Sequence, residues 1–114
     1  MKIYLLIISC LLFSCSNIEK KSSTEILPEI AFETILKEVH LAESFFEINK
    51  NKNLENARLE LSNSYFNIYN NNQTSEEEFK ETLNYYSKNP EKLKQIYANV
   101  LQQLTNERAK IDQQ

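Results

Sequence analysis

The sequence of 114 residues contains no glycine and only two prolines. Tight β-hairpins favour glycine because their central residues adopt positive φ. The absence of glycine therefore argues against a fold of many short strands, and it also excludes the glycine-rich loops that hold phosphates. Asparagine, the next most tolerant residue at left-handed turn positions, is frequent instead. We expect an all-α fold.

The two cysteines, Cys10 and Cys15, both lie near the amino terminus. The rest of the chain therefore has no cysteine for a disulfide or for a cysteine-based metal site. The 13 basic and 16 acidic residues give a net charge of −3, and no clustered basic face offers the surface that nucleic-acid binding requires. We expect no cofactor, no bound metal and no nucleic-acid partner.

The first 14 residues have the pattern of a secretory signal peptide. Lys2 supplies a positive charge, and the apolar run that follows is about eleven residues long, too short for a membrane-spanning helix of about 20. The sequence Leu-Phe-Ser-Cys at 12–15 resembles the lipobox of bacterial lipoproteins. In such proteins the cysteine thiol receives a diacylglyceryl group, and the peptide is cut before that cysteine. We therefore predict a signal peptide over 1–14 and lipidation at Cys15.

Two alternatives compete with this interpretation. Cys10 ends a second lipobox-like segment, but the apolar run before it is only about seven residues long. A plain signal peptide or a buried apolar helix would instead make Cys15 incidental. If Cys15 carries two or more acyl chains, it gives stable anchoring to the membrane. Ser16 is not the aspartate that usually retains lipoproteins in the inner membrane, which favours the outer membrane and a periplasm-facing position.

The remainder of the chain divides into a tether and a helical domain. Residues 15–27 are polar and lack apolar periodicity, which predicts a flexible tether after the lipidated cysteine. Over 28–112, apolar residues recur at three- and four-residue spacing in four segments separated by short polar loops. We expect this domain to be a small open bundle of about four helices.

Several residues mark the expected helix ends. Pro28 suits the first position of the first helix, and the asparagines of 70–72 suit a left-handed cap after the second. Thr74 and Glu77 have the spacing of a capping box for the third helix. The Asn-Pro pair at 89–90 ends that helix and begins the fourth.

The helical spacing also predicts which side chains face inward. In the first helix Glu33 and Lys37 are expected to form an exposed ion pair on the polar side. The inward residues of the first helix are then Phe32, Ile35, Leu36, Val39, Ala42, Phe45 and Phe46. Those of the second are Leu54, Ala57, Leu61, Tyr65, Ile68 and Tyr69, and those of the fourth are Leu93, Ile96, Tyr97, Val100, Leu101 and Leu104.

Two segments of the domain have recognisable patterns. One is Phe79-x-x-Thr82-Leu83-x-Tyr85-Tyr86-x-x-x-Pro90-x-x-Leu93-x-x-Ile96-Tyr97-x-x-Val100-x-x-x-Leu104, and the other is Glu38-Val39-His40-Leu41-Ala42-Glu43. Together they resemble an uncharacterised family of small Bacteroidota lipoproteins, domain of unknown function 4296. Thr82 and Val39 stand where that family usually has serine and methionine. The resemblance covers nearly all of the folded part; it implies a helical lipoprotein domain and no reaction.

The polar candidates for a site have simple structural interpretations. His40 is the only histidine, and Glu43 is its single acidic neighbour at i+3, whereas a metal site needs three or four ligands. We interpret His40 as a boundary residue that is hydrogen-bonded to another helix. A hydrolase centred on His40 is the alternative, and it requires this residue to be exposed beside a polar cleft. The carboxylates of 76–78 suit the first turn of a helix better than a cation site.

The tyrosines are the other candidates. Tyr85 and Tyr86 point about 100° apart around a helix, so one faces inward and the other covers a boundary between helices. With Tyr65, Tyr69 and Tyr97 they could line a groove for a peptide or apolar ligand, although ordinary packing also explains them.

These observations favour a non-enzymatic lipoprotein whose helical domain binds an envelope protein at the membrane. The candidate interaction surface consists of His40, Tyr65, Tyr85, Tyr86 and Tyr97. The alternative is a binding module for a small apolar or peptide ligand in a groove lined by tyrosine and phenylalanine.

Overall fold

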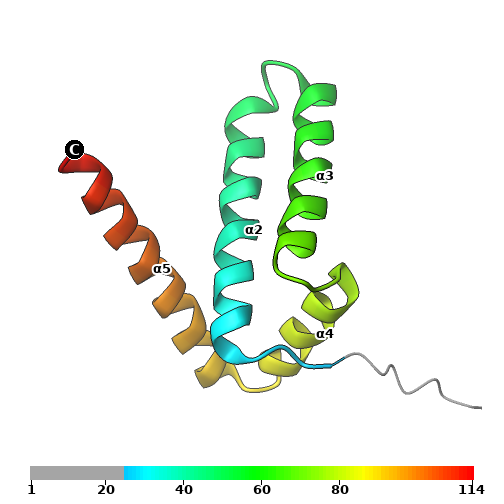
Figure 1. The fold of residues 1–114 in the computed structure, drawn as a ribbon, viewed down its shortest axis with the longest axis vertical. Helices are drawn as coiled ribbons and strands as arrows, with labels where there is room; N and C mark the ends of the chain where they lie inside the picture. The colour runs from blue at the N-terminus through cyan, green and yellow to red at the C-terminus, as the bar shows by residue number, and fades with distance from the viewer. Residues whose placement is uncertain (1–24) are drawn as a thin grey trace, which may run out of the picture.

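The computed structural model describes residues 25–114 (Figure 1). This range contains the helices α2 (Glu29–Asn49), α3 (Leu54–Asn71), α4 (Glu76–Ser87) and α5 (Pro90–Asp112). The expectation of an all-α bundle of about four helices is confirmed for this part of the chain. The predicted signal peptide, Cys15 and most of the predicted tether lie outside the described residues.

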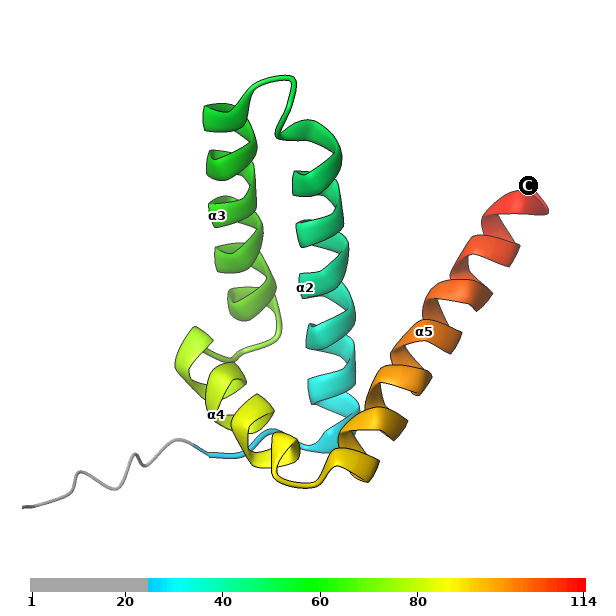
Figure 2. The same ribbon diagram turned by 180° about the vertical axis from the view of Figure 1, so that it is seen from behind.

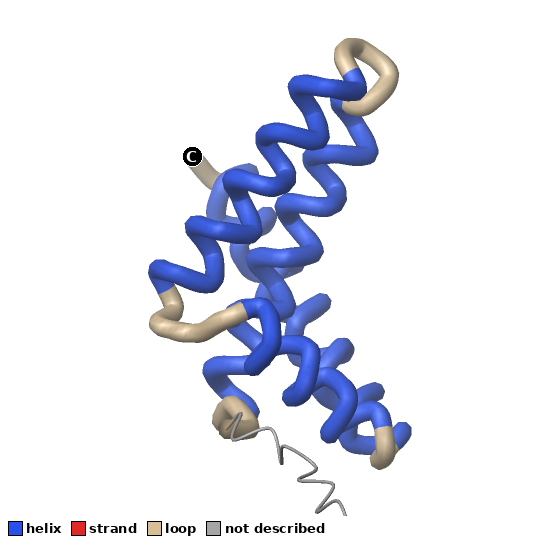
Figure 3. Tube along the Cα trace, turned by 90° about the vertical axis from the view of Figure 1, so that its right-hand side faces the viewer, coloured by secondary structure: helices blue, strands red, loops and turns tan. Residues whose placement is uncertain are grey.

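Helices α2 and α3 form a hairpin, and α4 and the start of α5 lie at one end of it. α2 and α3 run side by side in opposite directions, and α4 crosses beneath α3 (Figures 1 and 2). α5 starts beside the amino end of α2 and diverges from it, so its carboxyl end stands apart from the hairpin (Figures 1 and 2). The loop between α2 and α3 lies at the opposite end of the hairpin from α4 (Figure 3). We call the end where α4 and the start of α5 meet α2 the base.

The hydrophobic core lies at the base. Phe32 of α2 and Ile96 of α5 are completely buried, and the ring centroid of Phe32 lies 5.5 Å from that of Phe79 in α4. α3 contributes half-buried side chains, among them Tyr65 and Ile68, which pack against this cluster. The buried apolar residues of the cluster are Phe32, Ile35, Leu36, Val39, Phe79, Ile96 and Val100. The core therefore uses the first half of α2 and the first half of α5.

A buried threonine joins the chain before α2 to α4. Thr82 has no exposed surface. Its hydroxyl donates to the carbonyl of Glu78 at 2.7 Å and accepts from the backbone N–H of Leu27 at 3.0 Å. Leu27, the last residue of the predicted tether, is half-buried and packs against the core. The packed part of the chain thus begins at or before Leu27.

The start of α4 differs from the prediction by one residue. Ser75 caps the helix, because its hydroxyl oxygen accepts from the backbone N–H of Glu78 at 3.1 Å. The hydroxyl of Thr74 instead donates to the Glu78 carboxylate at 2.9 Å, and the Thr74 N–H donates to the carbonyl of Tyr69. Thr74 therefore belongs to the turn after α3, and the predicted pairing of Thr74 with Glu77 is wrong.

Two other helix ends also differ from the prediction. Pro28 precedes the first helical residue instead of occupying it, and its carbonyl accepts from the N–H of Phe32 at 2.9 Å. After α3 the residue with positive φ is Gln73, at 55°, and not an asparagine. The Asn72 side chain is engaged elsewhere, because it donates to the Glu38 carboxylate and to the Ile68 carbonyl. The predicted cap at Asn89, followed by Pro90, is confirmed.

The predicted ion pair between Glu33 and Lys37 is wrong, because α5 packs on that side of α2. Glu33 is only 7% exposed, and its carboxylate accepts from the Asn99 amide of α5 at 2.7 Å. Lys37 pairs with Glu107, also in α5. A surface that periodicity assigns to solvent is therefore a polar interface between two helices.

Four residues predicted to face inward are exposed instead. Phe45 follows Val39, the last core residue of α2, by six positions, and Tyr97 and Leu101 lie on a different side of α5 from the buried Ile96 and Val100. Leu54, at the start of α3, is also exposed. In α5 the buried residues thus occupy one face only.

Candidate functional site

The five residues of the predicted interaction surface do not form one surface. His40 and Tyr97 meet between α2 and α5. Tyr85 and Tyr86 lie together near the turn from α4 to α5. Tyr65 borders a separate hollow between α3 and the start of α4.

His40 packs against apolar side chains of α5. Its ring centroid lies 5.7 Å from that of Tyr97, and its Nδ1 lies 3.6 Å from the Glu43 carboxylate. Its Nε2 is buried and has no hydrogen-bond partner among residues 25–114, so the expected hydrogen bond to another helix is absent there. The open hollow beside it, about 330 Å³ in volume, is lined by Tyr97, Val100, Leu101 and Leu104. An apolar surface, rather than the polar cleft that a hydrolase would need, therefore adjoins His40.

Tyr85 and Tyr86 diverge as their adjacent positions predict. Tyr86 faces inward, with its ring centroid 5.2 Å from that of Phe32, while Tyr85 is exposed. Burial raises the pKa of Tyr86. Lys92 at the start of α5 borders the same hollow and forms an ion pair with Glu29 at 2.7 Å, and this bond raises the pKa of Lys92. The contacts of Tyr86 and Lys92 hold α4 and α5 against the start of α2.

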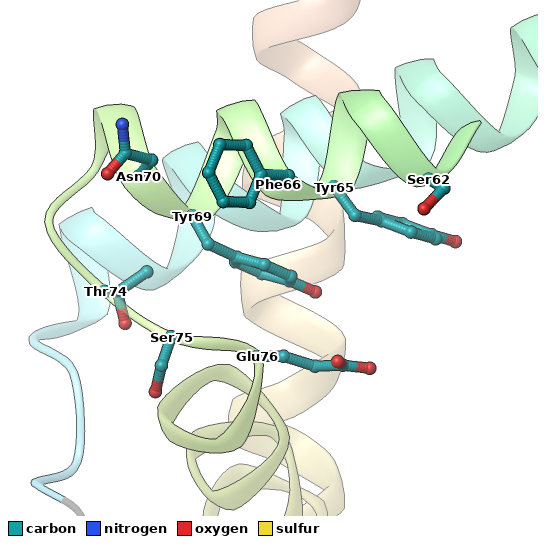
Figure 4. Close-up of a pocket in the computed structure, with 8 residues that line it drawn as sticks. All are labelled: Ser62, Tyr65, Phe66, Tyr69, Asn70, Thr74, Ser75 and Glu76. Atoms are coloured by element: carbon teal, nitrogen blue, oxygen red, sulfur yellow. The ribbon is translucent and has the colours of Figure 1, made fainter. Parts of the chain in front are cut away.

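The third hollow combines aromatic rings, hydroxyl groups and a carboxylate (Figure 4). Positions 62, 65, 66 and 69 share one side of α3 because they are three or four residues apart. The turn through Gln73 brings the capped start of α4 next to them. The hollow is open, has a volume of about 430 Å³, and is lined by Ser62, Tyr65, Phe66, Tyr69, Asn70, Thr74, Ser75 and Glu76. We call it the tyrosine groove.

Two nearly parallel rings form the wall of the tyrosine groove. The rings of Tyr65 and Tyr69 lie at 12° to each other, with centroids 6.3 Å apart. Tyr69 also contacts the core, since its ring centroid is 5.9 Å from that of Phe79. In Figure 4 the two phenol groups and the Glu76 carboxylate extend in the same direction, and Phe66 lies beside Tyr69. The wall is therefore supported by the core on one side and open on the other.

Carboxylates dominate the electrostatics of the tyrosine groove. The Tyr65 hydroxyl donates to the Glu43 carboxylate of α2 at 2.9 Å. Burial, this hydrogen bond and the nearby negative charges raise the pKa of Tyr65 to about 12. Burial, Glu76 and Glu43 likewise raise the pKa of Tyr69. Both phenols therefore stay neutral under ordinary conditions and lie in a negative field.

Phe66 and Glu76 were not among the predicted surface residues. The apolar spacing of α3 runs through Tyr65, Ile68 and Tyr69 and leaves Phe66 on the polar side, where it is 71% exposed. A large aromatic residue on a polar helix face is the sequence signal that could have added Phe66 to the groove residues. The position of Glu76 depends on the turn at 72–75, and periodicity does not report how that turn folds.

No three His, Cys, Asp or Glu side chains within residues 25–114 gather closely enough to hold a metal ion. None of the helices described is both long enough and apolar enough to cross a membrane.

Comparison with known proteins identifies a family and nothing further. The family model described as "Domain of unknown function (DUF4296)" matches residues 24–110, well over half of the chain. The family resemblance of the two sequence segments is thereby confirmed. A search of curated proteins and a search of solved structures each gave no match.

Proposed function

Since the chain belongs to the DUF4296 family, whose description assigns no activity, we propose a function from its own residues. In this proposal the protein is a non-enzymatic lipoprotein of the bacterial cell envelope, lipidated at Cys15. A tether links the anchor to the helical domain, and this domain binds an envelope protein beside the membrane. The proposed location is the outer membrane, facing the periplasm.

A stripe of exposed apolar side chains on α2 is the observation that supports a protein partner. Leu41, Phe45 and Ile48 are spaced four and three residues apart, so they share one face of the helix. They are 48%, 56% and 70% exposed. Contiguous exposed apolar residues with a polar border are typical of protein-binding surfaces. The stripe lies on the half of α2 beyond the core, where substitutions do little damage to the fold.

The lipid anchor is tested by replacing the proposed acceptor thiol. In the native host, Cys15→Ala should abolish incorporation of radioactive fatty acid and move the protein out of the membrane fraction. Cys10→Ala is the matched control and should change neither result. Retention of Cys15→Ala in the membrane fraction would show that the lipobox interpretation is wrong.

The partner surface is tested by crosslinking from the stripe. A photoreactive residue at position 45 should give a discrete adduct in intact cells, and Ile48→Ser should reduce its yield. Leu59→Ser, at an exposed position on α3, is the control and should leave the yield unchanged. If no adduct forms, or if the two serine variants reduce its yield equally, the α2 stripe is not a specific binding surface.

The tyrosine groove supports a second function, the binding of a peptide or small ligand. It is a hollow of about 430 Å³ with an aromatic wall and polar groups at its edge, and such composition is typical of ligand sites. The two functions are compatible, because the groove opens on α3 and α4 whereas the apolar stripe lies on α2.

A further inference from the structure

We propose that the tyrosine groove binds an arginine side chain in an extended segment of a partner protein, through juxtaposition of its aromatic rings with the Glu76 carboxylate. This inference rests on the second proposed function and specifies the chemical class of its ligand. The guanidinium group lies over the aromatic rings, and its N–H groups face the carboxylate.

The aromatic rings provide the first part of such a site. Tyr65 and Tyr69 are nearly parallel, at 12°, and follow each other along α3. Phe66 adds a ring that is mostly exposed. Aromatic faces carry partial negative charge and attract cations that approach them. Because Tyr69 is held by Phe79 of the core, the ring is already positioned before a ligand arrives.

The charged groups near the rings are the second part. The Glu43 carboxylate accepts a 2.9 Å hydrogen bond from the Tyr65 hydroxyl, and Glu76 lies at the edge of the groove. Both carboxylates raise the pKa of the two phenols. None of the eight residues that line the groove is basic. The groove therefore offers a negative surface to its ligand.

Lys80 and His40 lie close to these carboxylates, and neither lines the groove. Lys80 pairs with Glu76 at 2.8 Å, but both side chains are well exposed and Lys80 borders a different hollow. Exposed pairs of this kind contribute little to stability, so Glu76 can exchange Lys80 for a ligand or bind both. His40 lies 3.6 Å from Glu43 on α2.

The shape and composition of the groove favour arginine over other cations. Guanidinium groups stack on aromatic rings and bind carboxylates through paired N–H groups, whereas ammonium groups are compact and more strongly hydrated. The groove is open, so it covers only one side of a ligand. A free small molecule would gain few contacts there. An extended peptide gains more, because the exposed Ser62 hydroxyl and Asn70 amide lie at the edge to meet its backbone.

The test uses the full lipidated chain in detergent micelles and peptides of five residues with a central arginine. Binding is followed by NMR shifts or by fluorescence anisotropy of a labelled peptide. The arginine peptide should bind roughly ten times more tightly than the same peptide with citrulline, the neutral analogue of arginine. The lysine peptide should bind with intermediate affinity. Raising the salt concentration should weaken the arginine complex.

Matched variants locate the binding. Glu76→Gln and Phe66→Ala should each lower the affinity for the arginine peptide by about three- to tenfold, since each removes one contact of the guanidinium group. Glu77→Gln is the control for the charge change, because Glu77 lies in the same helical turn and outside the groove. Tyr85→Leu is the aromatic control on α4. Neither control should change the affinity.

The alternative results separate this inference from the function on which it depends. Equal binding of the arginine and citrulline peptides would overturn the arginine inference and leave ligand binding at the groove intact. Binding of none of the peptides would overturn both. Vesicles with amine headgroups that displace the arginine peptide would identify a lipid surface as the ligand, and would overturn the assignment to a protein segment.

Discussion

At the base of the molecule Phe32 and Ile96 have no exposed surface, whereas Phe45 and Ile111, further along the same two helices, are 56% and 70% exposed. The helices are continuous, so the difference arises from their neighbours. α4 and the start of α5 cover the first half of α2, and α5 then diverges (Figures 1 and 2). The base holds most of the buried apolar side chains, and the far ends carry exposed ones.

The largest expected effect is the loss of an aromatic ring at the base. Phe32→Ala should lower the free energy of unfolding by roughly 3–5 kcal/mol, because it leaves a cavity between Phe79 and Tyr86. Phe45→Ala, on the same helix but beyond the core, should change it by less than about 0.5 kcal/mol. Urea unfolding followed by circular dichroism measures both. Similar losses for the two variants would remove the distinction between base and far ends.

A second, smaller effect concerns hydrogen bonds at the base. Thr82→Val keeps the shape of the side chain but removes the acceptor for the Leu27 N–H and the donor to the Glu78 carbonyl. The buried N–H left without a partner should cost about 1–3 kcal/mol.

Thr105→Val is the matched control for this substitution. Thr105 is exposed, and its hydroxyl donates to the Leu101 carbonyl within the same helix. Thermal melting should show a clearly lower melting temperature for Thr82→Val and almost no change for Thr105→Val. A large loss at Thr105 would mean that the end of α5 is packed in solution.

The contrast between base and far ends also separates what the sequence can predict from what it cannot. Periodicity predicts the helices. Asn89-Pro90 marks a helix boundary, because the capping side chain and the proline ring act on residues within one helical turn. Periodicity also indicates the apolar face of α2. It does not indicate how far a neighbour extends along that face, and for this reason Phe45 was assigned to the core.

The burial of polar side chains is harder to predict from the sequence, because it depends on partners that are distant in the chain. Glu33 is buried because Asn99, 66 residues later in the chain, donates to it. The tyrosine groove requires a turn at 72–75 that brings α4 against α3. Tyr65 was predicted as part of a binding surface and does line a hollow, but the residues opposite it depend on that turn.

The hydrogen bond between Tyr65 of α3 and Glu43 of α2 predicts a dependence of stability on alkaline pH. The folded pKa of Tyr65 is about 12, and its ordinary value is 10. Between these pH values the unfolded chain loses this proton while the folded chain keeps it. The unfolded state then binds fewer protons, so the free energy of unfolding falls as the pH rises from about 10 to 12. Below about pH 10 the contribution is fully present.

Two variants test this dependence. Tyr65→Phe should remove part of the decrease in stability between pH 10 and 12, and it should eliminate the tyrosinate absorbance change near pH 12. Glu43→Gln should shift that absorbance change to lower pH, because the charge that opposes ionisation is lost. If the absorbance titration of Tyr65→Phe matches that of the unmodified protein, Tyr65 does not have the raised pKa.

The smallest expected effect lies where α5 leaves α2. The pair of Lys37 and Glu107 joins the two helices beyond the core, and the Glu107 side chain is about half exposed. Such a pair contributes about 1 kcal/mol or less and is screened by salt. Glu107→Gln should therefore change overall melting only slightly, while amide exchange at the carboxyl end of α5 should become faster. Arg108→Gln, which leaves this pair intact, should not produce the faster exchange. If α5 instead exchanges as slowly as the first half of α2 in both variants, it does not behave as a diverging arm, and the exposed face of Leu101 must be covered in solution.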